Sequence, residues 1–258
     1  MTLITCVLLG FSLLISAPLP AADLAADVKA DYDAVLWPLF EHFHRNPELS
    51  TIESETARRI AEELRAAGFD VTEGVGGTGV VAIMKNGDGP MVMMRADMDG
   101  LPLQEKSGLE YASHRRQLDP ITGHEVSVMH ACGHDVHITS LVGTAHQMAK
   151  RKDLWSGTLM LLVQPAEERA LGARAMHDDD LWERFGKPDF ALAFHVSAQD
   201  VAGTIKVSED FPFLSTDPEI ASVYWQVGGT PREAFEREAA GGEPVPSHHS
   251  PLFKIDPE

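Results

Sequence analysis

"GTLMLLVQPAEE", residues 157–168, is the stretch of sequence that decides the fold class. The uninterrupted apolar run from Leu159 to Val163 is typical of a strand buried on both faces. Such strands belong to parallel sheets covered by helices, and functional side chains gather at the carboxyl ends of those strands. The stretch therefore predicts an α/β domain and directs attention to Glu167 and Glu168, which follow the strand.

Predicted helices and strands alternate on both sides of this stretch. Apolar residues spaced by threes and fours predict a helix over about 28–45, and a second helix follows Ser50 and Glu53, which have capping-box spacing. Further helices are expected over 136–152 and 173–186, and strands over 80–84, 91–94, 188–196 and 222–229. This order predicts a central, mostly parallel sheet flanked by helices.

The composition narrows the class of protein. The 258 residues are 44% apolar, which is enough for a substantial core, and their net charge is −18. Nucleic acids and anionic membranes both require a basic surface, so neither is expected as a partner.

An apolar run from Leu3 to Ile15 stands at the N-terminus and ends in proline and small residues. It predicts a signal peptide over residues 1–22, with export to the periplasm or secretion and no membrane attachment after cleavage. A membrane anchor or a mis-assigned start is the alternative, because no basic residue precedes Lys29. Cleavage would remove Cys6 and leave Cys132 alone, and metal ligation would explain a lone thiol in an exported protein.

"MHACGHDVH", residues 129–137, contains the second candidate cluster. Cys132 and His134 lie two residues apart, and in a loop both side chains can face one cation. Glu168 follows one predicted strand and His195 ends another. One histidine at a strand end is more often structural, but these four residues together predict a metal site.

Two pairs of carboxylates suit metal-assisted hydrolysis. Of Glu167 and Glu168, one can hold a metal ion while the other accepts a proton from water. In "RADMDGLP", residues 95–102, Asp97 and Asp99 share one face of an extended segment. They could orient ligand histidines, which makes Asp99 a candidate catalytic residue, or they could pair structurally with Arg95.

Five ordered motifs, "HRNPELS", "RADMDGLPLQE", "MHACGHDVH", "QPAEE" and "FALAFHV", resemble the M20 metallopeptidase family. The similarity is greatest to its amidohydrolase branch, which includes hippurate hydrolases, N-acyl-amino-acid deacylases and auxin-conjugate hydrolases. The resemblance implies a zinc-peptidase-like α/β domain, two Zn²⁺ or Mn²⁺ ions and cleavage of an amide bond. It implies that Glu167 is the general base. The implied metal ligands are Cys132, His134, Glu168, His195 and, from "SHHSPLF", His249, whereas His130 and His137 are left as structural.

The family's lid domain is expected to be missing from this chain. "AGTIK", residues 202–206, runs directly into "VSEDF", whereas family members carry a whole domain there. We therefore expect residues 23–258 to form a truncated catalytic domain that lacks the lid near 206–207. Because the lid often forms the dimer contact, a monomer or weak dimer is expected.

Three functional hypotheses remain at this point. The first is a metal-dependent amidohydrolase that cleaves N-acyl amino acids, such as hippurate, or related small amides. The second is a catalytically inactive metal-binding remnant, or interaction module, of the same fold. The third makes Cys132 a nucleophile and His134 its base, which would leave Glu168, His195 and His249 unexplained.

Overall fold

The computed structural model describes residues 21–208 and 220–255. Almost all of the predicted signal peptide (1–22) and most of the "VSEDFPF" segment therefore lie outside the described residues. Within the described ranges, no helix has both the length and the apolar character needed to cross a membrane.

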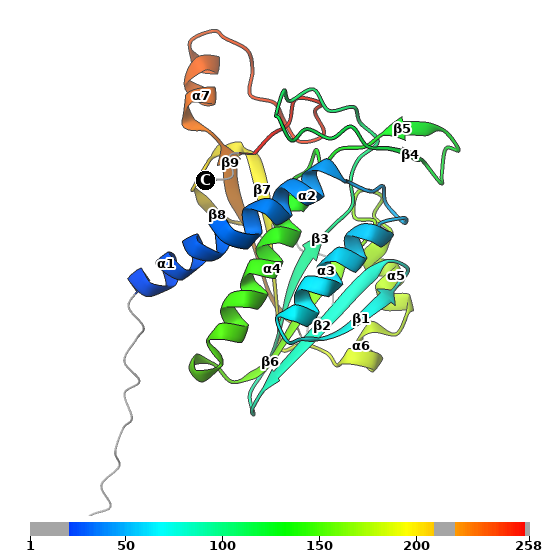
Figure 1. Cartoon of the computed structure of the whole chain (residues 1–258), viewed down its shortest axis with the longest axis vertical. Helices are drawn as coiled ribbons and strands as arrows, with labels where there is room; N and C mark the ends of the chain where they lie inside the picture. The colour runs from blue at the N-terminus through cyan, green and yellow to red at the C-terminus, as the bar shows by residue number, and fades with distance from the viewer. Residues whose placement is uncertain (1–20, 209–219, 256–258) are drawn as a thin grey trace, which may run out of the picture.

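A seven-stranded mixed sheet forms the centre of the molecule, with strand order β1-β2-β6-β3-β7-β9-β8 (Figure 1). Its strands are β1 (Asp70–Val75), β2 (Gly79–Asn86), β3 (Met91–Asp97), β6 (Gly157–Gln164), β7 (Phe190–Val201), β8 (Ile205–Ser208) and β9 (Ala221–Thr230). The four central strands, β6, β3, β7 and β9, run parallel, while the edge pairs are antiparallel. The expected mostly parallel sheet is confirmed.

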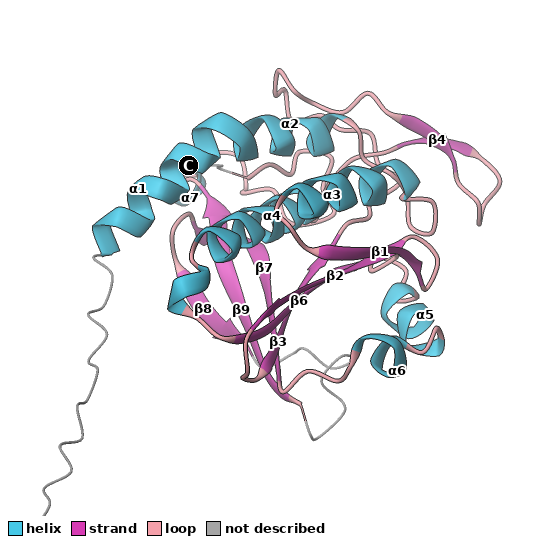
Figure 2. Cartoon of the chain, turned by 60° about the horizontal axis from the view of Figure 1, so that its bottom comes forward, coloured by secondary structure: helices cyan, strands magenta, loops and turns pink. Residues whose placement is uncertain are grey.

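Helices cover both faces of this sheet (Figure 2). One face packs against α2 (Trp37–Arg45), α3 (Ser54–Ala66) and α4 (His134–Lys150), which follow α1 (Ala21–Asp31) and the π-helical turn η1 (Tyr32–Leu36). The opposite face packs against α5 (Gly172–Asp178) and α6 (Leu181–Phe185). A short 3₁₀ turn, η2 (Lys152–Leu154), follows α4, and α7 (Arg232–Ala239) follows β9. Strands buried between two helical layers explain the continuous apolar runs in the sequence.

Three local expectations were wrong. The helix expected over 173–186 is two helices, because Asp180 takes a left-handed φ of 57° between them. Strand β7 does not end at His195 but continues to Val201, pairing with β9 up to Ser197 and again, after a shift in register, at Val201. Ser50 and Glu53 do not form a capping box, since α3 begins at Ser54 and neither side chain caps it.

Two further regions bear on the expected architecture. A small hairpin, β4 (Arg116–Leu118) and β5 (Glu125–Ser127), projects beside the main sheet and was not predicted.

After residue 201, the described strands β8 and β9 extend the main sheet. The absence of a lid stays a prediction, because residues 209–219 lie outside the described part of the chain.

Candidate metal centre

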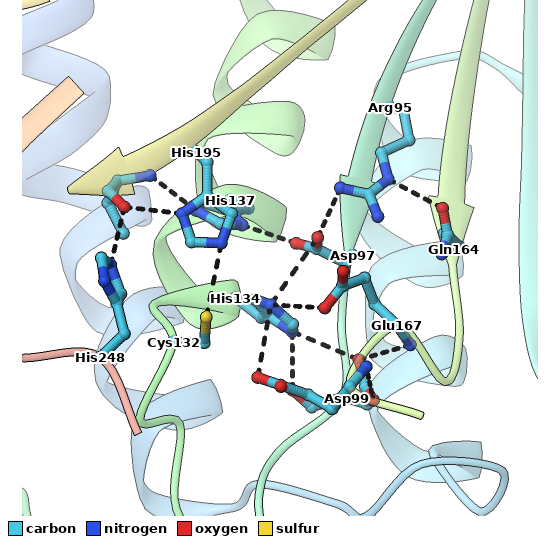
Figure 3. A network of polar contacts seen from close by, with 12 residues as sticks. Arg95, Asp97, Asp99, Cys132, His134, His137, Gln164, Glu167, His195 and His248 are labelled. Carbon is cyan, nitrogen blue, oxygen red and sulfur yellow. Dashed lines mark hydrogen bonds and ion pairs between the residues drawn. The ribbon is translucent and has the colours of Figure 1, made fainter. Parts of the chain in front are cut away.

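The candidate site lies where the parallel strands meet the first turn of α4 (Figure 3). Asp97 is the last residue of β3, and Glu167 and Glu168 lie in the loop after β6. His134 is the first residue of α4, and Gly133 before it has a φ of 82°, a left-handed conformation that suits glycine. The chain topology thus brings residues from three separate segments together at the carboxyl ends of the strands.

Five of the predicted residues fall into overlapping groups of possible metal ligands. Donor atoms of Cys132, His134 and His195 lie within 4.8 Å of one another, and so do those of Cys132, Glu168 and His249. The two groups share the Cys132 sulfur. The Cys132 Sγ atom is 3.4 Å from His195 Nε2, and His249 Nε2 is 3.2 Å from Glu168 Oε2. These residues therefore form two neighbouring donor groups, each of which could hold a divalent cation.

Backbone carbonyls fix which ring nitrogen of two histidines faces these positions. The Nδ1–H of His134 donates to the Asp99 carbonyl oxygen at 2.8 Å, and the Nδ1–H of His195 donates to the Val196 carbonyl oxygen at 2.6 Å. A carbonyl can only accept, so both Nδ1 atoms carry the proton. In the neutral rings each Nε2 keeps its lone pair, which is the form that binds metal.

Two buried polar atoms at the site lack a hydrogen-bond partner among the described residues: His134 Nε2 and Glu168 Oε1. His134 Nε2 lies 3.7 Å from both an Asp97 and a Glu167 oxygen, and 3.8 Å from Glu168 Oε1. Buried polar atoms are nearly always satisfied, so such orphans indicate a missing partner. A divalent cation between these atoms would supply it, and the mixed sulfur, nitrogen and oxygen donors suit Zn²⁺.

The charges at the site favour a cation as well. Burial raises the pKa of Glu168 to about 7, and the nearby Asp99, Glu167 and Asp97 carboxylates add to that shift. Burial also raises the pKa of the Cys132 thiol to about 11, so metal binding would have to displace its proton. A thiol that stays protonated is a weak nucleophile, which counts against the hypothesis of a cysteine nucleophile.

The two histidines interpreted as structural are not in the groups that share Cys132, although His137 forms a further donor group with Asp97 and His134. His137 uses both ring nitrogens: Nδ1–H donates to Asp97 at 2.6 Å, and Nε2 accepts the Val196 amide at 3.0 Å. His130 is buried, neither of its nitrogens has a hydrogen-bond partner within the described residues, and burial lowers its pKa to about 4. Neither side chain is arranged to join the two donor groups that share Cys132.

Asp97 and Asp99 serve both of the roles considered for them, pairing with Arg95 and orienting histidines. Arg95 Nη1 donates to Asp97 at 2.5 Å, which is the structural ion pair, while Asp97 also orients His137. Asp99 orients His134 through its carbonyl oxygen and accepts the Ser50 hydroxyl at 2.6 Å. Asp99 therefore contacts a candidate ligand but does not belong to the donor groups themselves.

Sequence reasoning missed three buried polar residues that support the site. Ser50 bonds to Asp99, and Glu53 accepts the backbone amide of Ala166, immediately before Glu167. His44 connects Glu105 to Asp135, the residue after His134. The capping-box interpretation concealed Ser50 and Glu53, although Ser50 lies within the "HRNPELS" motif.

Comparison with known proteins identifies the family. The sequence profile of peptidase family M20/M25/M40 matches residues 93–255. The chain belongs to this family. It is 42% identical to a hippurate hydrolase from Campylobacter jejuni over 153 residues, which cover 59% of this chain and 37% of that protein. It is 37% identical to thermostable carboxypeptidase 2 from Saccharolobus solfataricus over 210 residues, covering 80% and 50% respectively.

A solved structure supports the same assignment. A Bacillus subtilis protein described as a dinuclear metal-binding peptidase of family M20 superposes with a TM-score of 0.61 at 34% identity. The match covers 70% of this chain and 47% of that one. The expected family and fold are confirmed, and the chain spans about half or less of the length of these relatives.

Proposed function

We propose that this M20 protein is a metal-dependent amidohydrolase that cleaves the amide bond of N-acyl amino acids, such as hippurate, or of related small amides. The observation that carries the proposal is the pair of donor groups that share Cys132, with the unpartnered His134 Nε2 and Glu168 Oε1 beside them. The similarity to a hippurate hydrolase supports the substrate class.

The proposed metal ligands are Cys132, His134, Glu168, His195 and His249, which would hold two divalent ions, Zn²⁺ or Mn²⁺. Bound there, the ions would polarise the scissile carbonyl and make water more acidic. The protein's own residues would hold and orient the ions, and Asp99 would hold the His134 ring through its carbonyl.

Glu167 is proposed as the general base. Its side chain is 38% exposed, so it can reach an incoming water, whereas that of Glu168 is 6% exposed and faces the donor groups. Burial raises the pKa of Glu167, with a further contribution from Asp97, which makes this carboxylate a better proton acceptor. Glu167 would accept a proton from the attacking water and deliver it to the leaving amine nitrogen.

The test is release of glycine from hippurate by the purified chain supplied with Zn²⁺ or Mn²⁺, with metal content measured in parallel. Glycine release that chelator abolishes and added metal restores supports the proposal. Stoichiometric metal with no turnover on a panel of N-acyl amino acids would instead favour the metal-binding remnant. Thiol-reagent sensitivity combined with indifference to chelator would favour the cysteine nucleophile.

Three accompanying expectations are also proposals. Export through a signal peptide over residues 1–22, a missing lid near 206–207, and a monomeric or weakly dimeric state would together describe an exported, lidless catalytic domain. Size-exclusion chromatography with light scattering tests the oligomeric state. N-terminal sequencing of protein recovered from a bacterial periplasm tests cleavage.

A further inference from the structure

The loop that carries Glu167 and Glu168 has a backbone conformation that its own residues disfavour. Ala166 has a φ of 46°, in the left-handed region where the Cβ of an L-residue crowds the following carbonyl. Ala170, at the other end of the same loop, has a φ of 52°. Such residues persist only where the surrounding structure holds them, so contacts from outside the loop must fix it.

Two buried carboxylates supply those contacts through three successive backbone amides. The Ala166 amide donates to Glu53 Oε1 at 2.8 Å. The Glu167 and Glu168 amides donate to the two oxygens of Asp99, each at 3.1 Å. Hydrogen bonds to a charged acceptor are stronger than neutral ones, and here they act on the residues that aim the two glutamate side chains.

Glu53 comes from a distant part of the chain, 113 residues before Ala166. Its side chain precedes α3 and is fully buried, and its second oxygen accepts the Thr78 hydroxyl from the turn between β1 and β2, at 2.5 Å. Glu53 is not a member of the donor groups found among the described residues. Its direct hydrogen bond to the loop that carries Glu167 and Glu168 is the one from the Ala166 amide.

We propose that Glu53 is a positioning residue that holds the strained Ala166 backbone and thereby aims Glu167 and Glu168. This proposal rests on the proposed function, because the consequence of aiming is metal binding by Glu168 and proton transfer by Glu167. The alternative is that Glu53 only joins α3 to the β1–β2 turn, through Thr78. The two roles use different oxygens of one carboxylate, so they can be separated by mutation.

Three variants of the full chain separate them. Glu53→Ala removes both contacts, and Glu53→Gln keeps an oxygen that can accept the Ala166 amide. Thr78→Val is the matched control, because it removes the contact to the β1–β2 turn and leaves the loop contact in place. If Glu53→Ala does not fold, Glu53→Asp keeps the charge but shortens the reach to Ala166 and serves in its place.

The first measurement is amide hydrogen exchange in metal-free protein. We expect exchange at Ala166 to accelerate by about tenfold or more in Glu53→Ala, because local opening no longer breaks a charged hydrogen bond. Thr78→Val should leave exchange at Ala166 near the wild-type rate.

The second measurement is Co²⁺ binding, followed by absorption spectroscopy. Glu53→Ala should bind Co²⁺ roughly 10–100-fold more weakly, with an altered spectrum, as for other residues that orient ligands indirectly. Glu53→Gln should restore most of the affinity and the wild-type spectrum.

The outcomes distinguish this proposal from the proposed function. Wild-type exchange at Ala166 in Glu53→Ala, or equal losses of Co²⁺ affinity in Glu53→Ala and Thr78→Val, would overturn the positioning role. A wild-type chain that binds no Co²⁺ would instead overturn the proposed metal site. Exchange at Ala166 would still show whether Glu53 holds the loop.

Discussion

Glu168 and His249 contact each other in the candidate site, yet the chain holds them in opposite ways. The Glu168 side chain is 6% exposed, and its loop is fixed by amide hydrogen bonds to buried carboxylates. The His249 side chain is 55% exposed. The backbone of His249 is left-handed, with a φ of 60°, and its amide donates to the Ala131 carbonyl oxygen at 2.8 Å. The difference indicates a preorganised half of the site, made by the sheet, and an accessible half, made by the C-terminal segment.

The largest effect should follow a change in the preorganised half that leaves metal binding intact. Glu167→Gln should lower kcat by about 10²–10⁴-fold, because it removes the proposed proton acceptor. Metal content should stay at the wild-type level, since Glu168 and the other proposed ligands remain. Steady-state hydrolysis of hippurate and elemental analysis provide the two measurements, and Glu183→Gln, an exposed residue of α6, is the control. Loss of metal in proportion to activity would reverse the roles of the two glutamates.

The next largest effect should separate the two halves by metal stoichiometry. Cys132→Ala should weaken the binding of both ions, because both donor groups include its sulfur. His249→Ala should weaken the binding of only one ion, since His249 occurs in a single group and water can replace an exposed ligand. Titration with Co²⁺, followed by calorimetry, counts the sites in each variant. Loss of both ions in His249→Ala would contradict the division into two halves.

A third effect concerns His44, which links Asp135 in the first turn of α4 to Glu105. His44 Nδ1 lies 2.7 Å from Asp135 Oδ2, next in sequence to His134, and its Nε2 lies 3.1 Å from Glu105 Oε1. Burial alone would lower the pKa of His44, but the two carboxylates outweigh it and raise the pKa to about 9. The protonated imidazole therefore stabilises the fold relative to the unfolded chain.

The sign of this effect sets its pH window. Because the pKa is raised on folding, the stabilisation is fully present below the unfolded value near ~6.5 and is lost as pH rises through about 9. At ~1.4 kcal/mol per pKa unit, the contribution is on the order of 3 kcal/mol. Urea unfolding of metal-free protein should show wild type losing more stability than His44→Gln between mildly acidic pH and pH ~9.5. If stability falls equally with pH in the two proteins, His44 does not contribute to the pH dependence of stability.

The sequence predicted the sheet better than it predicted the supports of the site. Runs such as Leu159–Val163 identify buried strands, because strands covered by helices on both faces must be apolar throughout. Cys132, His134, Glu168 and His195 could be found because they lie in or next to such strands, or in a distinctive Cys-His motif, whereas His249 came only from the family resemblance of "SHHSPLF". Ser50 and Glu53 could not, because a local capping box and a long-range contact have the same sequence pattern. Only the fold shows that Glu53 meets Ala166, which is 113 residues away.

The smallest expected effect lies at the rim of the preorganised half. Arg169, next to Glu168, donates to Asp119 at 3.0 Å, and Asp119 also accepts the Ile121 amide in the turn of the β4–β5 hairpin. Arg169→Gln should remove this contact between the hairpin and the loop without disturbing the backbone-amide hydrogen bonds that hold Glu167. We therefore expect faster hydrogen exchange over 116–127, a small increase in KM and an unchanged kcat. Arg174→Gln, on the exposed side of α5, is the matched control. A fall in kcat comparable to that of Glu167→Gln would show that the hairpin, and not the buried carboxylates alone, fixes the loop.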